Sequence, residues 1–396
     1  MRSALTALTA LLIGSAAQAE APRLSGYIGA EATYFTSEGL YAGQLEDFQG
    51  SFVFAPELRW RSDDRDTQIR FSGFARWDSE DSNRTHWDVR EAYVRRQVGD
   101  FSVLLGANKV FWGVTESRHL VDVVNQLDLL EYTDDDARLG QPMLELSLSK
   151  NWGTVSAFFM TGFREQEFPG IDGRLRAPLV VDESAATYGH SSEEWAPDTA
   201  LRYSNTFGSV DLGLSAFQGT SREPLLLPTA GGTALRPHYA RIWQAGIDVQ
   251  WTGDNALWKL EAIRRGSEEF ETFEAAVGGI EYTVYQIGGS DGDLGLIAEY
   301  LYDGRGANTP VTAFQDDVFL GARWTANDSN DTSLLAGGFY DLEDGSTSFR
   351  AEFERRLENG LLLKVTGQGF GHSDSANPLD ALREDDFLSV SLEHHF

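Results

Sequence analysis

The residue types that most often carry catalysis are scattered along this chain. It has seven histidines, which are His86, His119, His190, His238, His372, His394 and His395. The last two are adjacent on an extended segment, where neighbours point to opposite faces, so they cannot share a metal ion. No H-x-x-x-H or phosphate-loop spacing occurs, and nothing selects Ser149 or Ser215 as the nucleophile of a serine–histidine pair. We therefore expect no enzyme and no bound cofactor.

Charged residues that alternate with apolar ones form a second group. If the apolar positions face outward, the inward positions carry both signs, including Glu261 and Glu299. The inward cations of greatest interest are Arg59, Arg70, Arg76, Arg202, Arg323, Arg350 and Lys364. Opposed charges of this kind favour a water-filled pore in which a transverse field sets selectivity. The same residues could instead pair with one another along a solvated wall.

Residues 113–141 form the third long link between segments, and their middle is apolar from Leu120 to Leu130. Leaving each large aliphatic side chain in water costs roughly 1.5–3 kcal/mol, so we expect this link to fold inward against residues 101–112 and 142–150. Its polar residues are Asp122, Asn125, Asp128, Glu131 and the triplet Asp134, Asp135 and Asp136. These would face Arg59, Arg70 and Arg76 across the pore. A loop with a short helix packed on the rim is the alternative.

The elements that must position these residues are strands, because polarity alternates with period two over segments of about ten residues. The segments span 24–34, 51–61, 66–77, 85–97, 101–112, 142–150, 153–163, 198–207, 209–219, 239–252, 256–266, 273–287, 293–303, 316–325, 332–341, 346–356, 360–371 and 385–396. Their alternation predicts an all-β fold, namely a transmembrane antiparallel up-and-down β-barrel. Their number predicts about 18 strands, with 16 as the alternative. Trp60, Trp77, Trp112, Trp251 and Trp324 fall at strand ends, where interfacial aromatic girdles lie.

The connections alternate strictly between short turns rich in Gly, Asn and Asp and longer links. Outer-membrane barrels show this rhythm because their periplasmic turns are short and their extracellular loops long. A soluble sandwich has no reason to follow it. The parity places both chain ends on the periplasmic side.

The chain begins with an arginine at position 2, an apolar run from Ala4 to Ala17 and an A-x-A site at Ala17 to Ala19. This pattern predicts a signal peptide over 1–19, followed by a single barrel domain over 20–396. The chain contains no cysteine, and its net charge of −29 argues against nucleic acid as a partner.

The final alternating run ends in Phe396 and resembles the closing strand of bacterial outer-membrane barrels. That resemblance implies that Phe396 is read by the barrel assembly machinery. Trp112-Gly113 followed by Asp122, Asn125 and Asp128 resembles the W-G…N-x-x-D segment of a family of uncharacterised bacterial porin-like proteins, although Gln126 replaces the usual proline.

These features together predict a porin-like channel in the outer membrane of a Gram-negative bacterium. Small solutes would diffuse through it passively, and the inward-folded link 113–141 would narrow the pore. Its partners would be outer-membrane lipid and lipopolysaccharide. A plugged, non-conducting structural or biogenesis barrel is the main alternative, and a barrel enzyme is the less favoured one.

Overall fold

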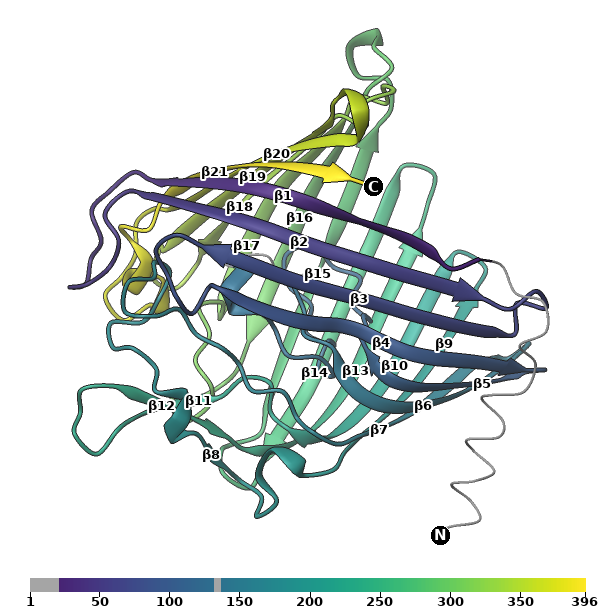
Figure 1. Ribbon diagram of the computed structural model, residues 1–396, viewed down its shortest axis with the longest axis horizontal. Coiled ribbons are helices and arrows are strands. Elements are labelled where there is room, and N and C mark those ends of the chain that lie inside the picture. The colour runs from purple at the N-terminus through teal and green to yellow at the C-terminus, as the bar shows by residue number, and fades with distance from the viewer. Residues whose placement is uncertain (1–20, 132–136) are drawn as a thin grey trace.

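A computed structural model describes residues 21–131 and 137–396 and shows a closed antiparallel barrel of 18 strands (Figure 1). The barrel strands are β1 (Arg23–Phe35), β2 (Phe48–Arg61), β3 (Thr67–Asp78), β4 (His86–Val98), β5 (Phe101–Asn108), β6 (Gln141–Lys150), β7 (Gly153–Met160), β9 (Asp198–Phe207), β10 (Val210–Thr220), β13 (Arg241–Thr252), β14 (Ala256–Ser267), β15 (Phe273–Val284), β16 (Asp293–Asp303), β17 (Asp316–Thr325), β18 (Ser333–Asp341), β19 (Thr347–Arg356), β20 (Leu361–Phe370) and β21 (Phe387–His395). Each strand pairs with the next, and β21 pairs with β1 to close the ring.

Every predicted strand segment corresponds to one of these barrel strands, so the prediction of about 18 strands is confirmed and the alternative of 16 is wrong. The largest difference lies at β5, which ends at Asn108 rather than at residue 112. The chain leaves the wall there because the Val110 amide donates to the Asn125 side chain instead of to a neighbouring strand (2.8 Å). The predicted signal peptide and the triplet Asp134 to Asp136 lie outside the described residues.

The predicted alternation of faces is visible in β21. Leu388, Val390 and Leu392 are 41–48% exposed on the outside, whereas Ser389 and Glu393 are buried on the inside. The outer face of the barrel is therefore apolar and its inner face polar. Trp112 departs from its predicted place in a girdle because it is buried inside the barrel, where its ring meets the edge of Phe158.

Two of the long links contain a small sheet that alternation did not predict. It joins β8 (Thr187–Tyr188), β11 (Leu225–Pro228) and β12 (Leu235–Tyr239), with β12 antiparallel to β11 and parallel to β8. Strands of two to five residues are too short for a period to be recognised. The 3-10 helices are η1 (Leu129–Glu131), η2 (Glu183–Ala185), η3 (Glu193–Trp195), η4 (Ile287–Gly289), η5 (Glu358–Gly360) and η6 (Pro378–Leu382). Within the described residues, no helix is long and apolar enough to cross a membrane.

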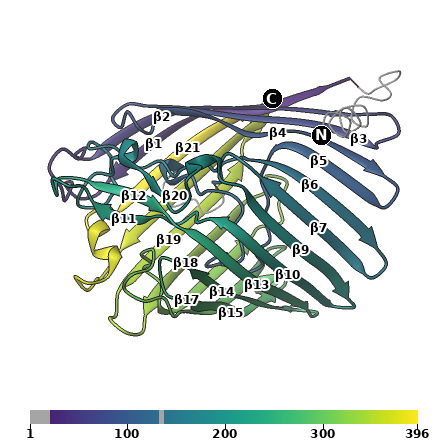
Figure 2. The same ribbon diagram turned by 90° about the horizontal axis from the view of Figure 1, so that it is seen from below.

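Figures 1 and 2 show the small sheet beyond one end of the barrel, which we call the long-loop end, and short turns at the opposite, short-turn end. Arg174 locks the long-loop end. It is fully buried, donates from Nε to Asp385 Oδ1 (2.6 Å) and from Nη1 to the carbonyls of Ser37 and Glu46, and stacks over Phe35. The link between β7 and β9 is thereby fastened to the seam where β21 meets β1.

We predict that this lock protects the link between β7 and β9 from trypsin. In Asp385→Ala, the buried guanidinium loses its carboxylate, a change that costs about 3–5 kcal/mol for a buried ion pair. Cleavage after Arg174 and Arg176 should then appear in mass spectra of the digested, folded variant. Glu384→Ala is the matched control, because it preserves the backbone carbonyl that accepts from Arg174. Rapid cleavage of the unmodified protein at Arg174 would contradict the buried lock.

Candidate functional site

The link that follows β5 runs through the inside of the barrel, and its apolar residues are buried there. Val121 is 0% exposed and Val124 is 1% exposed, and both belong to a cluster that includes Phe217, Ile242 and Ile263 of the inner wall. The inward fold expected for this link is therefore present, and no helix precedes η1 in residues 113–131. The packing surface extends well beyond the predicted segments 101–112 and 142–150, because the cluster reaches β10, β13 and β14.

Two carboxylates of the wall hold the backbone of this segment. Glu261 of β14 is 0% exposed and accepts from the amides of Val114 (2.7 Å), Thr115 (3.1 Å) and Val121 (3.1 Å) and from the Thr115 hydroxyl.

Glu299 of β16 accepts from the amides of Glu116 (2.9 Å) and Ser117 (2.8 Å). A segment inside a barrel has no strand ladder to satisfy its amides, so these carboxylates supply the missing acceptors. We call Glu261 and Glu299 the wall anchors.

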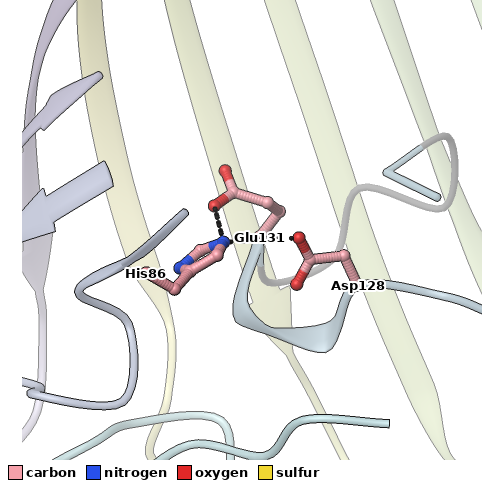
Figure 3. Close-up of side chains that lie close together, drawn as sticks. All are labelled: His86, Asp128 and Glu131. Carbon is pink, nitrogen blue, oxygen red and sulfur yellow. Dashed lines mark ion pairs between the residues drawn. The ribbon is translucent and has the colours of Figure 1, made fainter. Parts of the chain in front are cut away.

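The other end of the segment is fastened to the opposite part of the wall by an ion-pair cluster; Figure 3 shows three of its side chains, His86, Asp128 and Glu131. Arg76 of β3 donates from Nε to Glu131 (2.9 Å) and from Nη1 to Glu31 (2.9 Å). Arg90 of β4 donates to Asp128. We call Arg76, Arg90, Asp128 and Glu131 the clasp.

His86 lies at the centre of the clasp. Its Nδ1 is 2.9 Å from the Arg84 carbonyl, and its Nε2 is 3.5 Å from Asp128 and 3.7 Å from Glu131. A histidine with two carboxylates is a set that can bind a divalent metal, and the three ligand atoms lie within 4.8 Å of one another. Arg76 and Arg90 already neutralise both carboxylates, however, so we assign the cluster a role in fastening the segment.

The electrostatics of Asp128 agree with that role. Burial favours the neutral acid, but the His86 imidazole and the Arg90 guanidinium outweigh burial and lower the pKa of Asp128 to about 2. Its contribution to stability is therefore present above the usual aspartate pKa and is lost only as the pH falls toward 2. The clasp keeps Asp128 ionised at neutral pH.

The other predicted residues of the segment stabilise its own conformation. Asn125 accepts from the Val110 amide and donates to the carbonyls of Asn108 and Leu139 (2.9 Å each). Asp122 accepts from the Trp112 amide (2.7 Å). The side chains of Asp122, Asn125 and Asp128 are each about 2% exposed. They are thus buried in protein and do not face open lumen, which differs from the expected acidic surface over the pore.

The arginines expected to face that surface are also placed differently. Arg76 binds Glu131 directly, so no gap separates them. Arg59 pairs with Glu57 (2.6 Å), and Arg70 pairs with Glu91 (2.8 Å). Arg59 and Arg70 are register partners near the short-turn end, whereas Arg76 lies near the opposite end of β3. The expected wall of fixed cations across the pore is therefore not formed.

Two cavities remain on either side of the inward segment. The first, of about 640 Å³, we call the loop-side chamber; its lining includes Phe314, Phe319, Phe339, Lys259, Arg323 and Arg350. The second, of about 730 Å³, we call the turn-side chamber; its lining includes Arg95, Lys109, Glu145, Lys150, Arg202 and Asp248. Phe111 and Val114 line both chambers, and we call the place between the chambers where they lie the junction.

Arg202, Arg323 and Arg350 are thus the predicted cations that reach these chambers. Arg202 forms a two-pronged pair with Asp248 and stacks over Trp112. Lys364 lies elsewhere and pairs with Glu393 (3.1 Å).

Sequence reasoning missed Arg90, His86 and Phe111, because their partners lie far away in the chain. It also overlooked Gly288 to Gly292, which reads G-x-S-x-G. These residues form the turn between β15 and β16, and Ser290 Oγ donates to the Ile287 carbonyl (2.7 Å). Among the described residues, Ser290 forms no hydrogen bond with a histidine, so this turn does not form a serine–histidine pair.

Comparison with known proteins assigns no family. No protein-family model matches the chain, and no curated protein matches it. Among solved structures, a variant of Rh. blastica porin is 14% identical over 95% of this chain and 100% of its own, with a TM-score of 0.47. OmpT, an outer membrane protein of Vibrio cholerae in its trimer form, is 11% identical over 95% and 99%, with a TM-score of 0.49. Sequence identities and TM-scores this low do not assign a function, so the function is inferred from the geometry of this chain.

We predict that Glu261→Gln loosens residues 114–121 while the barrel stays folded. The amide group of glutamine offers one acceptor oxygen in place of two, and a hydrogen bond to a charged group contributes about 1.5–3 kcal/mol. Hydrogen exchange of this segment, followed by mass spectrometry, should accelerate roughly tenfold to hundredfold. The matched control is Glu57→Gln, an inward carboxylate that binds Arg59 instead of the segment. Equal exchange in both variants would refute the anchoring role.

We also predict that this anchor weakens as the pH rises. Burial lowers the pKa of His119, but Glu261, 3.8 Å from Nδ1, outweighs burial and raises it above its usual value. The ion pair is therefore fully present below about pH 6.5 and is lost as the pH passes the raised pKa.

A cysteine at Val121 in this cysteine-free chain reports the effect. Its labelling rate in a His119→Gln background, divided by the rate with His119 present, should be well above one at pH 6 and close to one at high pH. A ratio that does not change with pH would contradict the pair.

Proposed function

We propose that this chain is a porin-like channel of a Gram-negative outer membrane, through which small solutes diffuse passively. The observation that carries the proposal is the pair of chambers that share Phe111 and Val114 in their linings. The turn-side chamber includes Lys150 and Thr206, next to short turns. The loop-side chamber includes Leu379 and Leu382 of η6, in a long link. We propose that the two chambers join past the inward segment and so connect the two ends of the barrel.

The outer surface supports a membrane location. Large apolar side chains face outward along the strands, including Leu201 (57% exposed), Leu296 (48%) and Leu320 (62%). An apolar band of this kind is costly in water and favourable in hydrocarbon. Aromatic residues mark both ends of the band. Trp77 and Trp87 lie exposed at the long-loop end, and the paired residues Trp251 and Trp258 lie exposed at the short-turn end.

The terminal residue fits the same proposal. The Phe396 amide donates to the Gly26 carbonyl (3.0 Å), which extends the seam between β21 and β1, and its side chain is 46% exposed. An aromatic side chain displayed at the last position of the closing strand is available to the assembly machinery. We propose that Phe396 serves assembly, and that lipid and lipopolysaccharide surround the folded barrel.

The runner-up is a non-conducting barrel, and one observation favours it. The inner cluster joins Val121, Val123 and Val124 to the wall and fills part of the lumen with packed side chains. A plug held this firmly by the wall anchors and the clasp would leave the chambers as separate pockets. Conduction distinguishes the two functions directly.

We predict that the protein forms channels in planar bilayers and that deleting residues 120–131 raises the single-channel conductance, because the deletion removes the packed residues that divide the lumen. Deletion of residues 230–233, the exposed tip between β11 and β12, is the control and should leave conductance unchanged. Absence of channels in the full chain, with a folded barrel, would support the plugged alternative. Unchanged conductance after the 120–131 deletion would show that the segment does not narrow the path.

A further inference from the structure

The loop-side chamber combines an aromatic wall with the cations Lys259, Arg323 and Arg350. The carboxylates Glu116 and Glu352 also line it and pair with Arg323 and Arg350. A pore for fully hydrophilic solutes does not need the aromatic wall. We propose that this chamber and its junction with the turn-side chamber bind amphipathic monoanions, namely carboxylates that carry a flat aromatic or short apolar body. The inference rests on the proposed channel function and specifies its substrate class.

The apolar wall is built from three aromatic rings. Phe339 lies 4.6 Å from Phe314 and 4.9 Å from Phe319, measured between ring centroids. The Phe319 ring rests directly on two glycines of the wall: a Cβ added to Gly337 would lie 2.4 Å from the ring, and one added to Gly321 would lie 3.0 Å from it. The absence of side chains at these glycines lets the ring lie against the sheet, so the chamber presents aromatic surface to its contents.

The charged side of the chamber is already organised by carboxylates. Arg323 donates to Glu116 (2.7 Å) and to Glu281 (3.0 Å), and Lys259 donates to Glu281 (3.2 Å). Arg323 nevertheless keeps 36% of its side chain exposed, whereas Glu281 keeps 8%. A solute carboxylate can therefore reach the guanidinium, while Glu281 remains behind it as a fixed partner.

The junction between the chambers decides the sign of the solute charge. Phe111 is 55% exposed there, and its ring lies 4.7 Å from that of His119. Lys109, two residues away, is exposed in the turn-side chamber and has no ion-pair partner among residues 21–131 and 137–396. The nearby Glu261 carboxylate is fully buried and is turned toward backbone amides. An aromatic ring near an ammonium group that forms no ion pair within the described residues favours an anion with an apolar body over a cation of the same shape.

The path from one chamber to the other repeats this pairing. Aromatic rings and Arg323 line the loop-side chamber together, and Phe111 and Lys109 line the turn-side chamber together. A solute that carries a ring and a carboxylate can thus exchange one pair of contacts for the next as it moves. Repeated weak sites permit release as well as entry.

The test measures block of potassium chloride current in planar bilayers by three probes: 3-phenylpropionate, propionate and phenethylammonium. Propionate lacks the ring, and phenethylammonium has the ring with the opposite charge. We expect 3-phenylpropionate to block at a concentration about tenfold lower than either other probe, which corresponds to about 1.4 kcal/mol. Equal block by propionate, or stronger block by phenethylammonium, would overturn the proposal.

Two variants assign the effect to named side chains. Phe339→Ser should abolish the preference for the ring, and Lys109→Gln should abolish the preference for the anion. Arg264→Gln is the control, because it removes a cation that is 63% exposed outside the two chambers and pairs with Glu274. Probe preferences that stay the same in Phe339→Ser and Lys109→Gln would place the binding site elsewhere and overturn the assignment.

Failure of the channel proposal is distinguishable from failure of this inference. If the folded protein forms no channels, equilibrium dialysis of labelled 3-phenylpropionate against the protein in detergent replaces the current measurement. Saturable binding that Phe339→Ser removes would then support the site and contradict the channel. Channels without any preference for 3-phenylpropionate would support the channel and contradict the site.

Discussion

The interior of this barrel depends on one requirement: a backbone segment inside a protein must find partners for its amides. The wall strands satisfy their own amides in the sheet, but residues 114–121 have left the sheet and lie within the ring. Glu261 and Glu299 meet the requirement by turning carboxylates inward to accept several amides each. Buried charge is costly when alone, and the number of donors around each carboxylate makes it tolerable here.

Charge balance follows from the same constraint. The chain carries a net charge of −29, yet other carboxylates of the interior are matched by arginines that each bridge two acids. Arg76 joins Glu31 to Glu131, and Arg323 joins Glu116 to Glu281. Such bridges tie the inward segment to strands on separate parts of the wall. The inward segment lies between the loop-side and turn-side chambers. The chambers are lined by the parts of the inner wall that the segment does not cover.

The barrel could be predicted from the sequence, whereas the arrangement of the residues inside it could not. Alternation is a local property, because the outward Leu388 and the inward Ser389 differ in polarity within two adjacent positions, and the strands could be predicted from it. The hydrogen bond between Glu261 and the Val114 amide joins residues 147 positions apart. The local alternation of polar and apolar residues carries no information about such a contact. The burial of Leu120 to Leu130 could be foreseen from polarity alone, but its packing partners could not.

The arginines show the same limit. Their inward direction could be predicted from alternation, but their partners could not. Arg76 was expected to face the acidic link across the pore, and it instead binds Glu131 and Glu31 directly. The aromatic wall escaped prediction because Phe319 depends on Gly321 and Gly337, which contribute space and leave no polarity signal.

The central claim is that the segment after β5 lies against the inner wall at β13, and one cross-link tests it directly. The chain has no cysteine, so Val121→Cys with Gly246→Cys introduces a single pair. A Cβ at Gly246 would lie 3.2 Å from Val121 Cγ1, within reach of a disulfide, and 2.6 Å from Ser215 Oγ, whose hydroxyl must turn aside. Mild oxidation of the folded double variant should give a bond between residues 121 and 246 in nearly every molecule, detected by mass spectrometry of peptides. Two free thiols after oxidation, with the barrel folded, would show that the segment lies elsewhere.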